Sequence, residues 1–203
     1  SKIMQIDVLF AFLTSVFLLT LSPGPDIIYV FYKSSTSGFK EAAKLSIGLT
    51  SGLLIHTLFV VLGISALIKS NQDYYDIIKY FGFIYFSYLA LSQFFNKNKS
   101  DNKRNEGKNS FVTGLLMNLL NPKVSIFFIA FLPAFVFHND LAVNLQFLIL
   151  GFIFWLIATL IFLTISFFSN FLKPKFENFM KSKESKFIQG IIFQLIAIYI
   201  LLS

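Results

Sequence analysis

Long apolar stretches alternate with short polar connections along the whole chain. A transmembrane helix needs about 20 mostly apolar residues. Six stretches approach or exceed this length, and they cover residues 6–32, 42–68, 74–95, 111–137, 145–168 and 187–202. The pattern predicts an all-α polytopic membrane protein with six transmembrane helices in a single domain, residues 1–203. The first stretch lacks a small-residue cleavage site, so we expect it to be retained.

Two of the six stretches are interrupted by proline. The first contains Pro23-Gly24-Pro25, and the fourth contains Asn121-Pro122. A broken helix in lipid is tolerated only where the freed backbone groups are buried or line a wet cavity. We expect Ser22 and Asn121 to cap new half-helices that open with Pro23 and Pro122. Their positive ends would lie near the middle of the bilayer and suit a carboxylate.

A polar run at residues 96–110 divides the chain into halves, residues 1–95 and 111–203. A shift of 99 residues places Ser22-Pro23 on Asn121-Pro122 and Gly52 on Gly151. Three segments in each half give the halves opposite orientations. The expected architecture is therefore two inverted three-helix halves, a plan used by many transporters. The alternative is a coincidence of helix-breaking residues.

Composition supports a membrane protein. Hydrophobic residues make up 56% of the chain and charged residues 13%, and the mean hydropathy is +0.72. Soluble domains have about 25% charged residues, and disordered chains have fewer apolar ones. The chain has no Cys, which excludes disulfides, a cysteine nucleophile and thiolate metal sites. It also has no phosphate-binding loop, dinucleotide fingerprint or Ser/His/Asp grouping, so we expect no enzyme, cofactor or bound metal.

The chain has a net charge of +7, and most of its basic residues lie in alternate connections between the predicted helices. Thirteen basic residues fall in three alternate connections: Lys33, Lys40, Lys44, Lys97, Lys99, Lys103, Arg104, Lys108, Lys173, Lys175, Lys181, Lys183 and Lys186. This asymmetry predicts that these connections are cytoplasmic and both termini outside. The lysines would attract anionic lipid. Their dispersal over three connections argues against a nucleic-acid partner.

Two ionisable residues lie inside the broken stretches. Asp26 is the acidic residue placed well inside an apolar segment, where an ionisable group is a functional candidate. It could exchange a proton or hold a substrate ammonium group; the alternative is that it neutralises the first turn of its half-helix. Lys123 opposes the dipole of its helix, which suggests pairing with a substrate carboxylate or with Asp26. The alternative is snorkelling to the cytoplasmic face.

The second stretch adds a histidine. Gly48, Gly52 and His56 recur every four residues and share one helix face. The glycines permit close helix packing. His56 could relay protons near neutral pH or could be a hydrogen-bonded packing residue. Asn118 lies three residues before Asn121 and is expected to line the same cavity.

The chain resembles the LysE/RhtB family of amino-acid exporters. The resemblance rests on Ser22-Pro23-Gly24-Pro25-Asp26, on Gly38, Gly48, Gly52, His56 and Gly63, and on the segment from Asn121-Pro122-Lys123 to Pro133. It extends over nearly the whole chain. One departure is Ser35-Thr36-Ser37, where relatives often have an apolar residue, and this leaves the substrate class open.

The resemblance implies export of amino acids or related metabolites across the bacterial plasma (inner) membrane, with proton antiport. It places the two proline breaks at the functional centre. The partners would be a small-molecule substrate, protons and the lipid bilayer, and a homo-oligomer is compatible with the sequence. Some relatives are linked to cadmium, so a cation exporter is one alternative, although the lack of Cys disfavours a soft metal. A non-transporting membrane subunit is the other.

Overall fold

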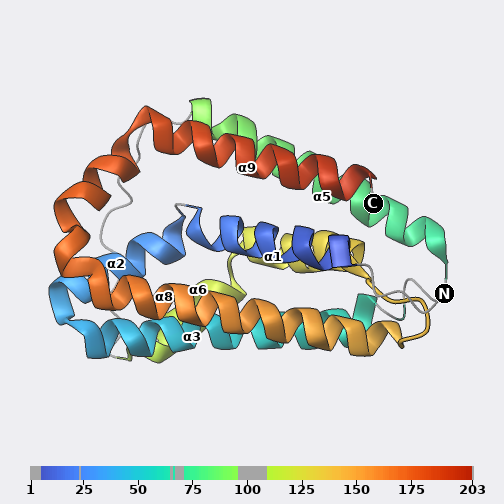
Figure 1. Ribbon diagram of the computed structural model, residues 1–203, viewed down its shortest axis with the longest axis horizontal. Coiled ribbons are helices and arrows are strands. Elements are labelled where there is room, and N and C mark those ends of the chain that lie inside the picture. Colours follow the sequence, from blue (N-terminus) through green and yellow to red (C-terminus); the bar gives the residue numbers. More distant parts are fainter. Residues whose placement is uncertain (1–5, 23, 65, 67–70, 96–108, 203) are drawn as a thin grey trace.

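The computed structural model describes residues 6–22, 24–64, 66, 71–95 and 109–202, and these contain helices and no strand (Figure 1). Pro23 and residues 96–108 of the expected polar connector lie outside the described residues. The elements are α1 (Ile6–Leu21), α2 (Pro25–Ser37), α3 (Phe39–Phe59), the π-helical η1 (Val60–Ile64), α5 (Gln72–Phe95), α6 (Ser110–Leu119), α7 (Pro122–Ile126), the π-helical η2 (Phe127–Phe131), the 3₁₀-helical η3 (Leu132–Phe135), α8 (Val143–Lys181) and α9 (Lys183–Leu202).

The first and fourth apolar stretches are both bent. The angle between α1 and α2 is 53°, and the angle between α6 and the helical run Pro122–Phe135 is 52°. Pro25 and Pro122 occupy the first turns of the helices that follow the bends. Proline is tolerated there because the first helical N–H groups have no partner inside the helix. The predicted interruption of these two stretches is confirmed.

The described helices give fewer membrane spans than the six apolar stretches predict. Among the described residues, three helices are long and apolar enough to cross a membrane, and five spans result if each bent pair counts as one. The third stretch forms α5, whose 24 residues extend about 36 Å. Asp73, Asp76 and Lys79 in its first two turns reduce its hydropathy. A sixth span and the inverted repeat therefore stay predictions.

Two predicted connections are wrong. Lys33, expected between segments, lies inside α2 and is buried. There α2 continues to Ser37 and a single residue, Gly38, joins it to α3; its φ of 83° is a left-handed conformation that favours glycine. The lysine-rich segment after the fifth stretch is also helical, because α8 continues to Lys181. Lys, Glu and Met are good helix formers, so α8 extends beyond its apolar segment.

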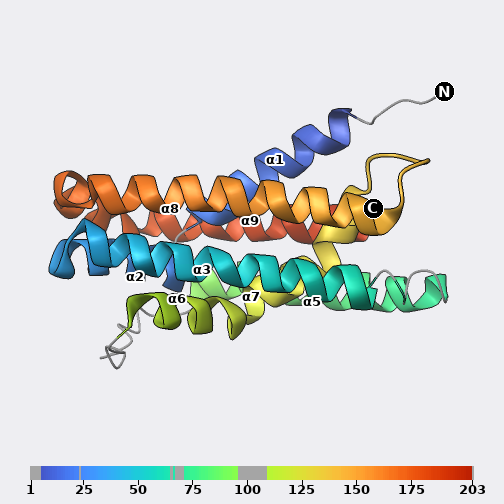
Figure 2. The same ribbon diagram turned by 90° about the horizontal axis from the view of Figure 1, so that it is seen from below.

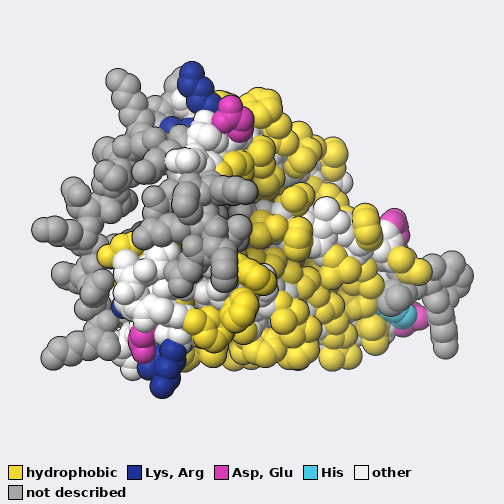
Figure 3. Space-filling view, turned by 60° about the vertical axis from the view of Figure 1, so that its left-hand side comes forward, with side chains coloured by type: hydrophobic (Ala, Val, Ile, Leu, Met, Phe, Trp, Pro, Cys, Tyr) yellow, Lys and Arg dark blue, Asp and Glu magenta, His cyan; other side chains and the backbone are white. Residues whose placement is uncertain are grey.

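The helix ends segregate into two groups. The first turn of α1 and the last turn of α9 lie at one end of the bundle, and the α2–α3 and α8–α9 turns lie at the other (Figure 1). An apolar band separates an end that carries basic and acidic side chains from an end that carries acidic side chains and a histidine (Figure 3). This arrangement suits a protein that crosses lipid, because the charged groups stay in water on both sides.

The bundle has two apolar clusters. Helix α3 packs on α6 and α8, and α5 packs on α9 (Figure 2). The larger cluster is rich in phenylalanine, and its fully buried rings are Phe12, Phe86, Phe127, Phe128, Phe131, Phe135 and Phe147. The smaller cluster joins α2, α3 and α8 through Ile27, Tyr29, Val30, Leu45, Leu49 and Phe162. The two helix breaks lie where these clusters meet.

Candidate functional site at the two helix breaks

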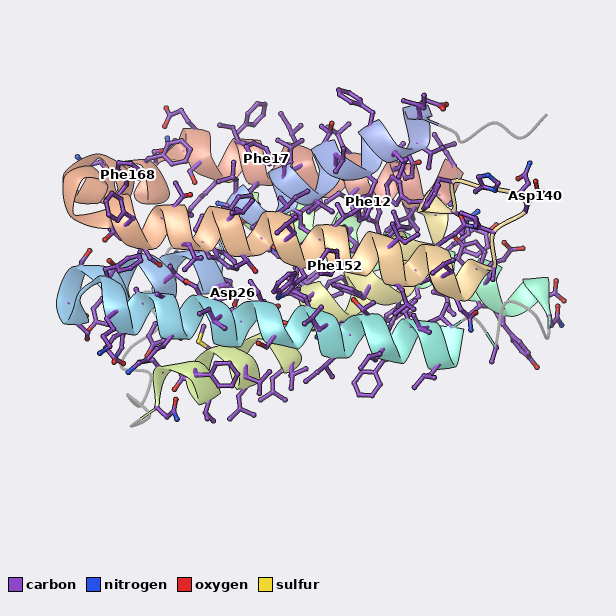
Figure 4. All side chains as sticks on the ribbon, turned by 60° about the horizontal axis from the view of Figure 1, so that its bottom comes forward. Phe12, Phe17, Asp26, Asp140, Phe152 and Phe168 are labelled. Carbon is purple, nitrogen blue, oxygen red and sulfur yellow. The ribbon has the colours of Figure 1, made fainter. Side chains whose placement is uncertain are left out.

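The two breaks meet inside the bundle although 95 residues separate them. The Asn121 side-chain amide donates a hydrogen bond from Nδ2 to Asp26 Oδ2 over 3.1 Å. Along the long axis of the bundle, the half-buried Asp26 lies between Phe168 near one end and Asp140 at the other (Figure 4). The first turn of α2 and the residue that precedes α7 therefore form one polar centre in an apolar interior.

At the second break, a local side chain caps the helix that follows. Asn121 is the N-cap of α7, and its Oδ1 accepts a hydrogen bond from the Lys123 backbone N–H over 3.1 Å. Its carbonyl accepts bonds from the N–H groups of Val124 and Ser125, also at 3.1 Å. The predicted Asn121 cap and Pro122 opening are confirmed. One amide thus caps its own helix with its oxygen and binds Asp26 with its nitrogen.

The first break has a different design. The N-cap of α2 is Gly24 in an extended conformation, without a side-chain cap, and Pro25 opens the helix. The prediction that Ser22 caps this helix and that Pro23 opens it is therefore wrong. Ser22 still belongs to the end of α1, because its N–H bonds to the Leu18 carbonyl over 2.9 Å. Its hydroxyl is buried and has no hydrogen-bond partner among the described residues.

Lys123 extends from the second break to the first. A Cβ added to Gly24 would lie 3.2 Å from Lys123 Nζ. The same Nζ lies 5.3 Å from the centroid of the Phe193 ring, a cation–π geometry. Lys123 also interacts electrostatically with Asp26. Lys123 and Asp26 therefore lie close enough for opposite charges on them to attract each other.

A small cavity of about 40 Å³ lies at this centre. That volume holds about three water molecules. The lining residues come from α1, α2, α3, α6, α7 and α8 and the first break, and they are Leu19, Thr20, Ser22, Gly24, Pro25, Asp26, Ile27, Leu53, Asn118, Lys123, Val124, Phe154, Ala158 and Phe162. The cavity therefore combines an acid, a cation and a helix N-terminus with mostly apolar walls.

Asn118 and His56 lie next to each other beside the cavity. Asn118 lines it, and His56 Nε2 lies 3.4 Å from the Asn118 carbonyl oxygen. The His56 ring also stacks on Phe128, with 5.5 Å between centroids. His56 does not line the cavity itself. Asn118 therefore belongs to the site, whereas His56 contacts Asn118 and does not reach the cavity.

The two glycines of α3 lie against α6. A Cβ added to Gly48 would overlap the backbone of Phe111, and one added to Gly52 would overlap the Asn118 side chain. On the opposite helix, a Cβ on Gly114 would overlap the Leu45 carbonyl. Such close packing is typical of small residues at helix interfaces in membranes. Gly52 also leaves the space that Asn118 occupies.

A serine cluster is a feature that the sequence reasoning missed. Ser34 on α2 donates to the Ser166 carbonyl of α8 over 2.5 Å and accepts from Ser169 over 2.6 Å. Ser46 on α3 lies 3.2 Å from the Ser166 hydroxyl. All four serines are buried. Ser34 lies four residues after Val30 and therefore on the same buried face of α2. That spacing indicates a buried serine, but it does not indicate the partners of Ser34, which lie more than 100 residues away in the sequence.

Gln146 is a second missed residue. It is fully buried, and its Oε1 accepts hydrogen bonds from the N–H groups of Phe137 and His138 over 2.8 and 3.0 Å. Its Nε2 donates to the carbonyls of His138 and Leu141 over 2.7 and 2.8 Å. One side chain thus fixes the connection between η3 and α8. No pattern in the sequence distinguishes this glutamine from a lipid-facing one.

The site offers charge complementarity and no metal cluster. Within the described ranges, no three His, Cys, Asp or Glu side chains are close enough to hold a metal ion. The uncapped end of α2 and the Lys123 amine can bind an anionic group. The Asp26 carboxylate can bind a cationic group or a proton. The arrangement can therefore bind a small polar molecule in an otherwise apolar interior.

Comparisons with known proteins identify the family of the chain. The LysE type translocator family model matches residues 17–203, which include both breaks. The chain is 30% identical to the uncharacterized membrane protein YrhP of Bacillus subtilis (strain 168) over 197 residues, covering 91% of this chain and 93% of the relative. It is 31% identical to the homoserine/homoserine lactone efflux proteins of Salmonella typhi and Salmonella typhimurium (strain LT2) over 147 residues, 70% of each chain. No solved structure matches the chain. The chain belongs to the LysE type translocator family.

Proposed function

We propose that the protein is a secondary transporter that exports amino acids or their close derivatives across the plasma membrane by proton antiport. The observation that carries the proposal is the meeting of two helix breaks at one small cavity, which Asp26 and Lys123 line and beside which Asn121 bonds to Asp26. Ionisable groups inside apolar membrane segments are costly and are usually retained for function. The efflux function named for the two Salmonella relatives supports the direction of transport.

The charges of the site assign roles to its residues. The substrate carboxylate would bind at the uncapped N-terminus of α2 and at Lys123, where both the helix dipole and the amine are positive. Asp26 would bind the substrate ammonium group or the coupling proton. Binding of the two to one carboxylate would be mutually exclusive, which couples their movements in opposite directions. Asn121 would hold Asp26 in place through its 3.1 Å hydrogen bond.

Transport requires the cavity to open. A volume of about 40 Å³ holds only a few waters, and an amino acid has at least five heavy atoms together with its hydration. The bent pairs α1–α2 and α6–α7 are the elements that would move, because their breaks already interrupt the helical hydrogen bonds. In this proposal the cavity faces the lysine-bearing cytoplasmic end and the outer end in turn.

Efflux from proteoliposomes tests the proposal. Vesicles containing the purified protein are preloaded with a mixed amino-acid pool, and loss is followed with and without an imposed pH gradient. Selective and gradient-dependent loss of a few amino acids is the expected result. Metal-ion efflux in parallel vesicles would favour a cation exporter on the same scaffold. Absence of both fluxes from folded, inserted protein would favour a non-transporting subunit.

A further inference from the structure

Two buried oxygen atoms at the cavity have no hydrogen-bond partner among the described residues. They are the Ser22 hydroxyl and the Asn118 side-chain carbonyl oxygen. Each residue is only 2% exposed, and both line the cavity. A buried polar atom without a partner costs free energy, so its presence in a folded protein requires an explanation. A ligand that occupies the cavity and bonds to both oxygen atoms would explain why neither has a partner in the protein.

The two residues reach the cavity from different parts of the fold. Ser22 ends α1, and its role as a helix cap is taken by Gly24. Asn118 belongs to α6, where its amide lies against Gly52 and its backbone carbonyl lies 3.4 Å from His56 Nε2. The Asn118 side chain thus occupies the space that the missing Gly52 side chain leaves, beside the cavity that Asn118 lines.

The chemistry of the two atoms selects a neutral polar group. An amide oxygen only accepts hydrogen bonds, whereas a hydroxyl both donates and accepts. A ligand hydroxyl could donate to Asn118 and accept from Ser22, and this would satisfy both atoms. Asp26 and Lys123 carry charge and suit the charged ends of a substrate. The rest of the cavity wall is mostly apolar and offers a substrate side chain few other polar contacts.

We propose that Ser22 and Asn118 are specificity-determining residues that bind a hydroxyl group on the side chain of the transported molecule. The inference rests on the proposed function, because it presumes that the charged ends of a zwitterion occupy the Asp26 and Lys123 side of the cavity. Gly52 is a positioning residue, since any larger side chain there would displace the Asn118 amide. A site built to bind a hydroxyl rejects an analogue without it, because the two oxygen atoms then stay unpaired.

The test measures binding of isosteric pairs to the purified full-length protein in lipid nanodiscs. Each pair exchanges a hydroxyl for a methyl group: serine with 2-aminobutyrate, homoserine with norvaline, and threonine with valine. The wild-type protein is expected to bind the hydroxyl member of its best pair at least about tenfold more tightly. Ser22→Ala and Asn118→Leu are expected to reduce this ratio to below about threefold while the affinity for the methyl member changes little.

Controls separate recognition from folding. Ser46→Ala removes a buried serine whose hydroxyl has partners and does not line the cavity, so the ratio should stay at the wild-type value. Ser22→Thr retains the hydroxyl and should retain the preference. A wild-type ratio near one, or a ratio that neither Ser22→Ala nor Asn118→Leu changes, overturns the inference.

Failure of the inference is distinct from failure of the proposed function. Tight binding and export of amino acids without preference for a hydroxyl would overturn the roles of Ser22 and Asn118 alone, and would assign the two oxygen atoms to internal water. No binding of any of the six amino acids would contradict both proposals. The wild-type ratio decides the question even if a variant does not fold.

Discussion

The two helix breaks use proline in the same way but satisfy their polar groups differently. At the second break, Asn121 caps α7 with its own side chain. At the first break, Gly24 caps α2 without a side chain, and Ser22 has no partner for its hydroxyl among the described residues. The polar contacts of the first break instead come from the second, through Asn121 and Lys123. One break is thus locally complete, and the polar groups of the other are contacted by its counterpart.

This difference suggests that the two breaks have different roles. The bend at the second break can keep its local geometry when the α6–α7 pair moves, because the cap of α7 comes from its own Asn121 side chain. It is also anchored in the phenylalanine cluster, since Phe127 and Phe128 follow directly and pack on Phe154 at 5.3 Å between centroids. At the first break no side chain caps α2, and Gly24, Pro25 and Asp26 line the cavity.

The largest effect is expected from Asp26→Asn. The substituted amide can still accept a hydrogen bond from Asn121, so the geometry of the first break should persist while the titratable charge is lost. We expect gradient-driven export to be abolished and membrane insertion to be normal. Proteoliposome efflux measures the first, and solubilised yield with a monodisperse elution profile measures the second. Asp76→Asn, at an exposed acid on α5, is the matched control.

Exchanging Asp26 and Asn121 tests whether the acid must lie at the first break. In the double variant Asp26→Asn and Asn121→Asp, an acid still faces an amide, and aspartate is also a good N-cap. We expect a folded protein that does not recover export, because the carboxylate has left the first turn of α2. Recovery of export would show that the pair matters more than the break on which the acid lies.

Lys123→Met is expected to have the next largest effect. The methionine side chain fills similar space beside Phe193 but removes the charge that reaches the first break. Losing one charge-assisted contact to a substrate carboxylate should lower export at limiting substrate by about tenfold or more. Initial efflux rates against substrate concentration measure this loss. Lys40→Met at the exposed start of α3 should behave as the wild type, and an equal loss there would remove Lys123 from the site.

Gly24→Ala tests the close approach of the two breaks. The φ of −148° at Gly24 suits any residue, so the substitution adds no backbone strain. Its methyl group would lie 3.2 Å from Lys123 Nζ and would push the amine away by a few tenths of an ångström. Small displacements at a binding centre lower rates, and we expect a decrease in export of about three- to tenfold. Gly63→Ala, with no atom within 4 Å of its new methyl, is the control.

The sequence predicted what depends on local chemistry. The prolines indicated both breaks, and Asn121 before Pro122 indicated its cap, because a cap is decided by residues a few positions apart. The long apolar stretches indicated an all-helical membrane protein, and the described residues form helices and no strand. The position of Asp26 in an apolar segment also drew attention to the residue that the structure places at the meeting of the breaks.

What the sequence did not predict depends on distant partners or on competition between similar residues. Ser22 and Gly24 are both good N-caps, and only the folded backbone selects Gly24. Lys33 looked like a connection residue because a charge at a helix end is usually exposed, yet it is buried where α2 packs on α3 and α8. The bonds of Ser34 to Ser166 and Ser169 span more than 130 residues of chain, and no local pattern reports them.

The smallest effect concerns stability and compares the two caps directly. Asn121→Ala removes the side-chain cap of α7 together with the hydrogen bond to Asp26, and should lower the free energy of unfolding by about 1 kcal/mol or more. Ser22→Ala removes a hydroxyl that has no partner among the described residues, so it should leave stability unchanged or raise it slightly. Thermal unfolding of both variants in the same detergent measures the difference. Equal destabilisation by the two changes would show that Ser22 has a structural partner, and the contrast between a complete and an incomplete break would then be lost.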